Sequence, residues 1–351
     1  MKRHAIIPVF IPHLGCPHSC VFCNQRAITA RSGPVSAEDV RRTAEQYLST
    51  LENSEGCTVE MSFFGGSFTG IPIEDQSRYL AIAKEYKHAG RISSIHMSTR
   101  PDYIDRRILD NLASYGADVI ELGVQSFDPE VLRLSERGHT VEQVYEACSL
   151  IKEYGFTLGI QLMIGLPGDS YWACMDSVAQ TVKIGPQIAR IYPTVIISGT
   201  RLAQMYLDGS YVPFSQDETL RIAKDMYLGL TGAGINVIRV GLKASALIND
   251  GDDSVVLGDT YHPAFRQLLD GAIARDRIEE RLRTTDILTV RAGSKAFSGA
   301  VGHKGANKKY FAAEYPQKTV IFKADASLGD YETVFEDGSG GNPPEAPGKK
   351  Q

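Results

Sequence analysis

The 351-residue sequence lacks any long apolar run and any strong excess of one charge. A membrane-spanning helix needs about 20 consecutive apolar residues, so the sequence predicts none. The formal net charge is only −5, which excludes a strong overall basic field. Any contact with nucleic acid would therefore need a local basic patch. Hydrophobic residues make up 43% of the chain and charged residues 23%, a balance typical of a globular protein with a substantial core.

The amino terminus lacks the features of a secretory signal. Its first residues, MKRH, are basic and apolar residues follow, but Pro8 and Pro12 interrupt this short stretch. No small-residue cleavage site comes after it, so we interpret the segment as a first strand. We expect a cytoplasmic protein, in which thiols stay reduced.

Strand-like and helix-like patterns alternate along the first two thirds of the chain. We expect strands at 3–11, 58–66, 92–100, 117–126, 156–168 and 187–197. We expect helices at 36–52, 73–87, 103–116, 128–138, 140–155, 170–184 and 217–234. Six strand–helix units in succession predict an α/β fold, a partial (β/α)6 barrel with a parallel sheet whose strands are apolar on both faces. Ligands of such a barrel bind at the carboxyl ends of the strands.

The alternation is lost from about residue 235. We expect the barrel to span 1–235, a small α+β C-terminal extension to span 236–336, and a Gly/Pro-rich disordered tail to span 337–351. The extension contains a run of basic residues with no acid between them: Arg291, Lys295, Lys304, Lys308 and Lys309. This run is consistent with contacts to nucleic-acid phosphates or with a solvated basic loop.

Three of the six cysteines fall within the short segment GCPHSCVFCNQ: Cys16, Cys20 and Cys23. In a reducing compartment this clustering favours a metal site over disulfides. Zinc sites usually pair CxxC with a second pair of ligands, and no second CxxC follows, although His13 or His18 could complete such a site. A four-iron cluster normally takes four thiolates, so three would leave one iron open to another ligand. The cluster is the better fit, and zinc remains an alternative.

The spacing CxxxCxxC, with the aromatic Phe22 before the last cysteine, resembles the radical SAM superfamily. The resemblance implies a [4Fe-4S] cluster on Cys16, Cys20 and Cys23 whose open iron binds S-adenosylmethionine (SAM). It also implies reductive cleavage of SAM to a 5′-deoxyadenosyl radical, which takes hydrogen from the substrate. A reducing electron donor such as flavodoxin or ferredoxin is implied as well.

The same resemblance implies SAM contacts at the ends of successive strands. The residues concerned are Gly65, Gly66, Ser67, Ser98, Thr99, Gln125, Arg137, Gln161, Met163 and Pro193. Gln125 would bind the ribose hydroxyls, and Arg137 would bind the methionyl carboxylate. Two alternatives stay open: the glycine pair forms an ordinary turn, and Arg137 pairs with Glu130 or Glu136. No catalytic residue is assigned.

Several motifs in order resemble the catalytic subunit of Elongator and its bacterial relatives, over about residues 5–235: GCPHSCVFCNQ, STRPD, ELGVQSFD, ERGHT, GLPGD and IYPTVIISGT. This implies modification of transfer RNA (tRNA). No long Gly-rich acyl-CoA pattern follows the barrel, so the acetyltransferase chemistry of that subunit is not implied. Two alternatives remain: a radical enzyme acting on a small molecule or peptide, and a non-catalytic iron–sulfur or zinc module.

Overall fold

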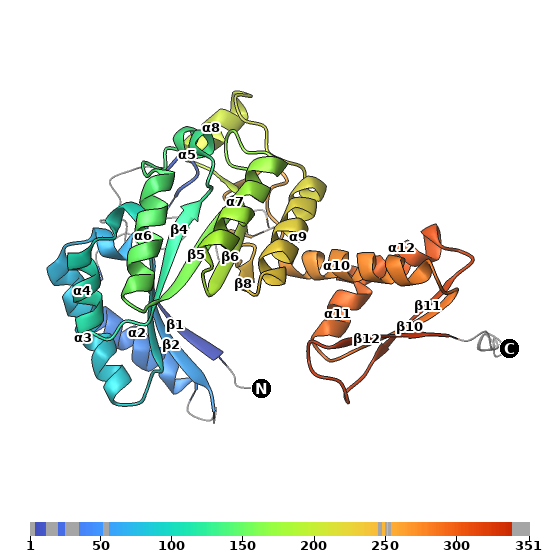
Figure 1. Ribbon diagram of the computed structural model, residues 1–351, viewed down its shortest axis with the longest axis horizontal. Helices are drawn as coiled ribbons and strands as arrows, with labels where there is room; N and C mark the ends of the chain where they lie inside the picture. Colours follow the sequence, from blue (N-terminus) through green and yellow to red (C-terminus); the bar gives the residue numbers. More distant parts are fainter. Residues whose placement is uncertain are drawn as a thin grey trace. The chain divides into compact units, whose positions relative to one another are not determined.

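The computed structural model describes residues 4–11, 20–24, 35–51, 56–244, 248–249, 251 and 254–338. The chain forms two compact units, Met1–Pro263 and Ala264–Gln351, which we describe separately (Figure 1). Cys16 and most of the tail that we expected over 337–351 lie outside the described residues.

The first unit is built on a curled parallel sheet of seven strands, in the order β1-β2-β3-β4-β5-β6-β8. The strands are β1 (His4–Ile11), β2 (Thr58–Gly65), β3 (Ser94–Thr99), β4 (Val119–Gln125), β5 (Thr157–Ile164), β6 (Ile188–Pro193) and β8 (Asn236–Val240). This half-barrel confirms the expected fold class. The sheet also continues through β8, which lies beyond residue 235.

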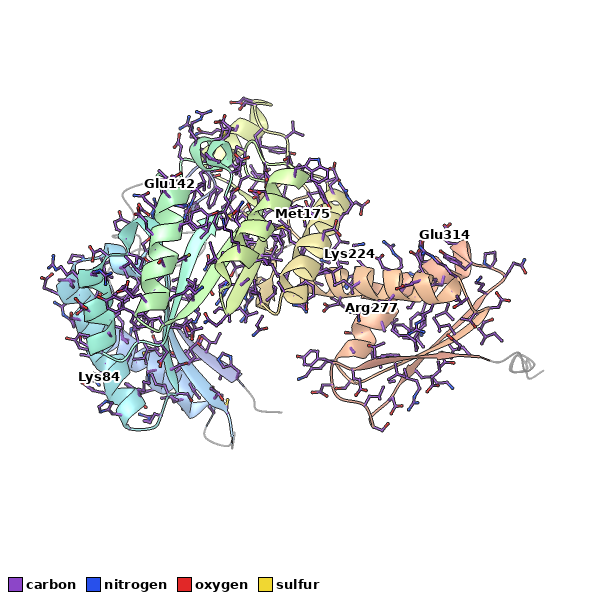
Figure 2. The ribbon with its side chains drawn as sticks, viewed as in Figure 1. Lys84, Glu142, Met175, Lys224, Arg277 and Glu314 are labelled. Carbon is purple, nitrogen blue, oxygen red and sulfur yellow. The ribbon has the colours of Figure 1, made fainter. Side chains whose placement is uncertain are left out.

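Helices connect successive strands of this sheet. They are α2 (Ala37–Ser49), α3 (Ile73–His88), α4 (Arg106–Ser114), α5 (Pro129–Leu134), α6 (Val141–Glu153), α7 (Tyr171–Ile184), α8 (Arg201–Leu207) and α9 (Gln216–Gly232). Ser36 caps the start of α2: its side chain accepts from the Asp39 amide, and the Asp39 side chain accepts from the Ser36 amide. Figure 1 shows α6 and α7 alongside β4 and β5. Neighbouring helices also contact one another: Lys84 of α3, labelled in Figure 2, donates a hydrogen bond to the Ser114 carbonyl at 2.9 Å.

The two faces of the sheet differ in polarity. On β5, alternate residues such as Leu158 and Ile160 are fully buried toward the helices, whereas Gln161 and Met163 point to the other face and are half-buried. We call this second face the lumen face. It carries polar side chains on β2, β3, β4, β5 and β6, so our expectation of strands apolar on both faces is wrong.

The segment after β6 differs from the single long strand that we expected over 187–197. β6 ends at Pro193, and β7 (Ile196–Ile197) forms a separate antiparallel pair with β9 (Val256–Leu257). The helix α8 then follows, although the sequence pattern did not predict it. Across the described ranges of the chain, no helix is long and apolar enough to cross a membrane.

The second unit has a three-stranded sheet packed with helices. Its elements are α10 (Phe265–Leu282), β10 (Ile287–Ala292), α11 (Ala296–Val301), α12 (Ala306–Glu314), β11 (Thr319–Ala324) and β12 (Thr333–Asp337). β10 is the central strand, parallel to β11 and antiparallel to β12. Its core gathers around Leu288 and Val290 of β10, Ile278 of α10 and Phe311 of α12. This arrangement has the α+β character that the sequence predicted.

Candidate functional site

The described part of the cysteine segment, residues 20–24, is anchored at the carboxyl ends of the strands. The Val21 amide donates to the Ser135 carbonyl at 3.2 Å, and the Val21 carbonyl accepts from the Leu202 amide at 2.8 Å. The Cys20 side chain is buried and Cys23 is half-buried. Cys16 lies outside the described residues, and within those residues no three His, Cys, Asp or Glu side chains gather as metal ligands would.

Two buried arginines lie beside the sulfur of Cys20. Arg137 Nη1 donates to Cys20 Sγ at 3.2 Å, and Arg100 Nη1 lies 4.0 Å from the same sulfur. Arg100 is held by Asp102, which accepts from its Nε at 2.9 Å and from its Nη2 at 3.0 Å. The guanidinium groups offset the negative charge that a ligand thiolate would carry. The sulfur is therefore placed in an electropositive, largely buried setting.

Arg137 does not form the ion pairs that the local sequence suggested. Glu130 pairs with Arg133 at 2.6 Å, and Glu136 pairs with Arg201. Arg137 Nη2 instead donates to the Gly123 carbonyl at the end of β4. The arginine therefore links the cysteine segment to the sheet.

Several buried polar atoms around this arginine have no hydrogen-bond partner among the described residues. They are Gln125 Oε1, Arg137 Nε and both ring nitrogens of His139. Buried polar groups are normally paired, so this cluster suits a polar ligand. Burial, followed by the nearby Arg137 and Arg100, lowers the pKa of His139 to about 3, so the imidazole is neutral.

Gln125 itself adopts an unusual backbone conformation. Its φ is 75°, and the pairing of β4 with β5 shifts register between Gly123 and Gln125. A non-glycine residue with positive φ is uncommon and costs about 1–3 kcal/mol, and such residues concentrate at functional sites. A Cβ at Gly123 would lie 3.0 Å from Gln125 Nε2 and 3.4 Å from Arg137 Nη2. Gly123 thus leaves the space that these two side chains occupy.

The glycine pair after β2 has a clear structural reason. Gly65 has φ of 107°, and a Cβ there would lie 2.5 Å from the Ile11 carbonyl oxygen. The Gly66 amide donates to the same oxygen at 3.1 Å. The ends of β1 and β2 can approach this closely only without a side chain. Ser67, the next residue, is buried.

The remaining residues expected at the site lie on different faces of the sheet. Ser98, Gln161 and Met163 are half-buried on the lumen face. Thr99 points the other way, and its hydroxyl lies 2.5 Å from that of Thr69. Pro193 is buried at the end of β6, on the face opposite the lumen. The geometry brings Cys20, Gln125 and Arg137 together and groups Ser98 with Gln161 separately.

Two family models match the sequence. One, described as "Radical SAM superfamily", covers residues 10–180, and the other, "Radical_SAM C-terminal domain", covers residues 186–275. The chain belongs to the radical SAM superfamily.

Two curated relatives are similar to nearly two thirds of this radical SAM chain, and the name of one of them states a tRNA modification. The chain is 26% identical over 257 residues to the "tRNA uridine(34) acetyltransferase" of Methanocaldococcus infernus, a match covering 62% of this chain and 48% of that protein. It is also 26% identical over 261 residues to "Elongator complex protein 3" of Bos taurus, with the same two coverages. The chain thus spans about half the length of these curated relatives.

A solved structure supports the same fold. The archaeal Methanocaldococcus infernus Elp3 with an N-terminal deletion superposes with a TM-score of 0.59 at 21% identity. The superposition covers 80% of this chain and 64% of that chain. Together with the family match, this confirms the radical SAM half-barrel that the sequence predicted.

The lumen face of this radical SAM half-barrel carries a buried ionic network that the sequence analysis missed. Its centre is Glu121, which is fully buried. Arg190 Nε donates to Glu121 Oε2 at 2.7 Å, and Gln161 Nε2 donates to Glu121 Oε1. Ser98 Oγ lies 3.4 Å from the same Oε1. The network fixes the Gln161 amide, so that its orientation depends on Glu121.

His96 extends this network to β2. Its Nδ1 lies 2.9 Å from Glu60 Oε1, and its Nε2 lies 3.7 Å from Glu121 Oε2. Ser62 also donates to Glu60, at 2.5 Å. Burial acts to raise the pKa of Glu60, but the contacts with His96 and Ser62 outweigh it and the pKa is lowered. The five strands from β2 to β6 are therefore linked through side chains as well as through the backbone.

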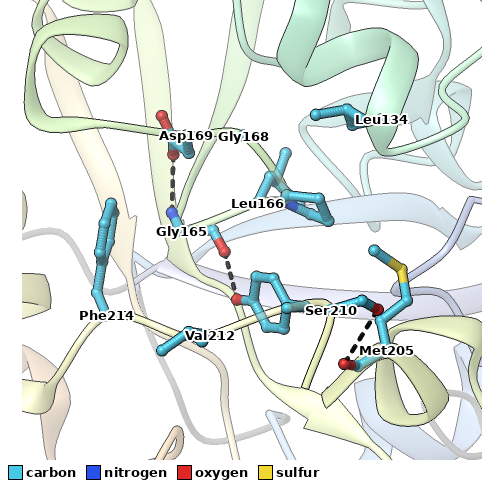
Figure 3. A pocket seen from close by; sticks show the side chains of 11 residues that line it. Leu134, Gly165, Leu166, Gly168, Asp169, Met205, Ser210, Val212 and Phe214 are labelled. Atoms are coloured by element: carbon cyan, nitrogen blue, oxygen red, sulfur yellow. Dashed lines mark hydrogen bonds between the residues drawn. The ribbon is translucent and has the colours of Figure 1, made fainter. Parts of the chain in front are cut away.

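A cavity of about 200 Å³ lies at the turn after β5, where the sequence reads GLPGD (Figure 3). Tyr211 donates from its hydroxyl to the Gly165 carbonyl at 2.5 Å, and Asp169 accepts from the Gly165 amide at 2.8 Å. A Cβ at Gly168 would lie 2.6 Å from Leu134 Cδ1. The glycines therefore let the turn pack closely, and the two polar side chains hold it in place.

The basic run of the second unit divides into paired and unpaired residues. Arg291 pairs with Asp325 and with Glu336. Lys295 pairs with Asp330 at 3.1 Å. The other three lysines, at 304, 308 and 309, are exposed and form no ion pair with any residue of the described ranges.

Proposed function

We propose that this chain is a radical SAM enzyme that holds a [4Fe-4S] cluster through Cys16, Cys20 and Cys23. When bound, the reduced cluster supplies one electron to cleave the sulfonium of SAM, which starts hydrogen abstraction from the substrate. Membership of the superfamily supports this proposal. The thiols would be kept reduced in the cytoplasm, where an electron donor such as flavodoxin or ferredoxin would serve the cluster.

The observation that carries the proposal is the position of Arg137. It joins Cys20 at 3.2 Å to the end of β4, and it lies among buried polar atoms that lack partners. A structural zinc site would need only its metal ligands. The cluster of unpartnered donors and acceptors around Arg137 suits a polar cofactor beside the metal.

The chain's own residues would bind and orient SAM as follows. Arg137 would hold the methionyl carboxylate, because its Nε has no other partner. Gln125 would accept from the ribose hydroxyls through its unpartnered Oε1. The backbone at Gly65, Gly66 and Ser67 would take the methionyl ammonium. The lumen-facing side chains would line the reaction space below, with Gln161 fixed by Glu121.

Anaerobic reconstitution tests this function. The protein would be loaded with iron and sulfide, reduced with dithionite and mixed with SAM, and 5′-deoxyadenosine would be measured by chromatography. The parent should release it, and Cys20→Ala should not. Cys148→Ala is the matched control, because Cys148 is a buried thiol far along the chain on α6. Release from Cys20→Ala at the parental rate would overturn the assignment.

We also propose that the substrate is RNA, and tRNA in particular. Support comes from the name of one curated relative, a "tRNA uridine(34) acetyltransferase", and from the exposed lysines of the second unit. Lysines without ion pairs keep their full charge for phosphates, whereas Arg291 and Lys295 are already neutralised by acids. Binding should therefore depend on Lys304, Lys308 and Lys309 more than on the paired residues.

Filter binding of total tRNA at several salt concentrations tests the RNA proposal. A triple Lys→Gln variant at 304, 308 and 309 should reduce the slope of log affinity against log salt by about 3. The double variant Arg291→Gln, Lys295→Gln is the matched control and should change the slope little. Equal affinity for tRNA in the triple variant and the parent would refute the lysine contacts. No measurable binding by the parent would favour a small-molecule or peptide substrate.

A further inference from the structure

Arg239 of β8 is a half-buried arginine. Within the described residues it forms no hydrogen bond or ion pair. The register pairs it with Arg190 of β6, after a shift that leaves Ile238 as an extra residue. Partners on adjacent parallel strands project to the same face, so Arg239 belongs to the lumen face. Its charge also acts to lower the pKa of Tyr192, although burial raises that pKa overall.

Arg190 and Tyr192 present further unused donors beside it. Arg190 uses Nε for Glu121 at 2.7 Å and Nη1 for the Tyr192 hydroxyl at 3.2 Å. Its Nη2 donates to no atom of the described residues. The Tyr192 hydroxyl accepts from Arg190, so its own proton is free to be donated. The Phe64 ring lies 5.4 Å from the guanidinium carbon of Arg190 and supports it from another strand.

These groups leave an excess of positive charge at the β6–β8 edge. Glu121 offsets the charge of Arg190. Nothing in the described part of the chain offsets Arg239, and a partly buried charge without a counter-ion is costly. The two guanidinium groups can only donate, and the Tyr192 hydroxyl, which already accepts from Arg190, has its proton left to donate. A common partner of the three groups is therefore an acceptor with negative charge.

We propose that Arg190, Tyr192 and Arg239 form an oxyanion subsite on the lumen face, which takes a carboxylate or phosphate group of the substrate. This identification of the ligand as substrate rests on the proposed radical SAM function. The subsite is separate from the proposed SAM contacts: Arg190 is the third of six residues in β6, whereas Gln125 is the last residue of β4 and Arg137, which follows α5, donates to the Gly123 carbonyl near that strand end. A planar guanidinium that is held by a carboxylate and an aromatic ring is well suited to recognising an oxyanion.

Arginine-specific chemical modification tests the subsite without requiring SAM cleavage. The full-length protein, reconstituted under anaerobic conditions, would be treated with phenylglyoxal, and the modification of Arg239 would be followed by peptide mass spectrometry. Inorganic phosphate and acetate would be added in separate arms. By mass action, an anion present at a concentration of about ten times its dissociation constant should slow the modification of Arg239 about tenfold. Arg107, exposed and unpaired on α4, is the internal control and should react at the same rate throughout.

The outcomes separate the two sources of the anion. Protection by phosphate alone assigns a phosphoryl group, protection by acetate alone assigns a carboxylate, and protection by both supports the shared oxyanion chemistry. Tyr192→Phe, which removes one donor and keeps the ring, should weaken protection about fivefold. If neither anion slows the modification of Arg239, the subsite is refuted. The modification of Arg239 can be measured even if the protein releases no 5′-deoxyadenosine. A failure of the subsite can therefore be distinguished from a failure of the proposed function.

Discussion

Replacing Glu121 with glutamine should destabilise the first unit by about 3 kcal/mol. Glutamine has nearly the same shape but no charge, so the change leaves the buried guanidinium of Arg190 without its counter-ion. Breaking a buried ion pair in this way costs about 3–5 kcal/mol. The lower end applies here, because Arg190 keeps its hydrogen bond to Tyr192 at 3.2 Å and its contact with the Phe64 ring.

Urea unfolding followed by far-ultraviolet circular dichroism measures this loss. For a unit of this size, 3 kcal/mol corresponds to a fall in Tm of roughly 6–12 °C. Glu130→Gln is the matched control: it breaks the exposed pair with Arg133, which solvent screens, and should leave the urea midpoint almost unchanged. The double variant Glu121→Gln, Arg190→Met should recover much of the loss, because it removes the unpaired charge.

Two results would contradict a stabilising role for the Glu121–Arg190 pair. If Glu121→Gln unfolds at the parental urea concentration, the ion pair does not contribute to stability. If the double variant is less stable than Glu121→Gln by the full cost of a second core substitution, the unpaired charge is not the cause of the loss.

Three further outcomes are expected. Gly65→Ala should lower the free energy of unfolding by about 3 kcal/mol, because φ is 107° and the new Cβ would lie 2.5 Å from the Ile11 carbonyl oxygen. Gly56→Ala is the control: its φ is 73° but the space around it is open, so it should cost about 1 kcal/mol. Equal losses of stability in thermal unfolding would contradict the clash. His139 binds its proton in the unfolded chain below pH 6.5 but in the folded chain only near pH 3. Parental stability should therefore fall as pH drops through this window more steeply than that of His139→Gln, and parallel urea curves would refute this. Burial raises the pKa of Cys148 to about 12, so this thiol stays protonated at pH 8. Ellman's reagent at pH 8 should therefore modify half-buried Cys57 in the native protein and should reach Cys148 only after unfolding. Equal rates of modification of the two cysteines in the native protein would refute this.

The sequence predicted the features that depend on local pattern. Alternating strands and helices could be placed because apolar spacing and helix caps are local signals, such as the Ser36 capping box. The resemblance, and no local pattern, assigned Cys20 to the cluster and Arg137 to SAM; in the structure Arg137 Nη1 lies 3.2 Å from Cys20 Sγ. The helix α8 was missed because it has only seven residues; Thr200, which caps it by accepting from the Ala203 amide, was the available signal.

The buried ionic network could not be predicted in the same way. The members of the network come from different strands. In the sequence, Glu121 and Arg190 each look like a single polar residue within an apolar segment. Only the register of the sheet brings them into contact. A period-two pattern of polar residues, present in HMS around His96 and in RIY around Arg190, was the available signal.

The ion pairs of the second unit depended on residues far along the chain. We considered Arg291 and Lys295 as basic residues with no acid nearby in the sequence. Their acidic partners come from the segments around β11 and β12, more than thirty residues later. Charge balance in a small sheet is thus a property of its strand pairing, and a local count of acids and bases does not detect it.

Among the described residues, the seven-stranded sheet begins at β1 and ends at β8, and these two edge strands do not pair with each other. A closed barrel has no edge strands, whereas this sheet has two. Under the proposed function, the sheet alone would not enclose a reactive intermediate on the lumen face. The substrate bound on that face should then help to determine how much SAM is cleaved without product.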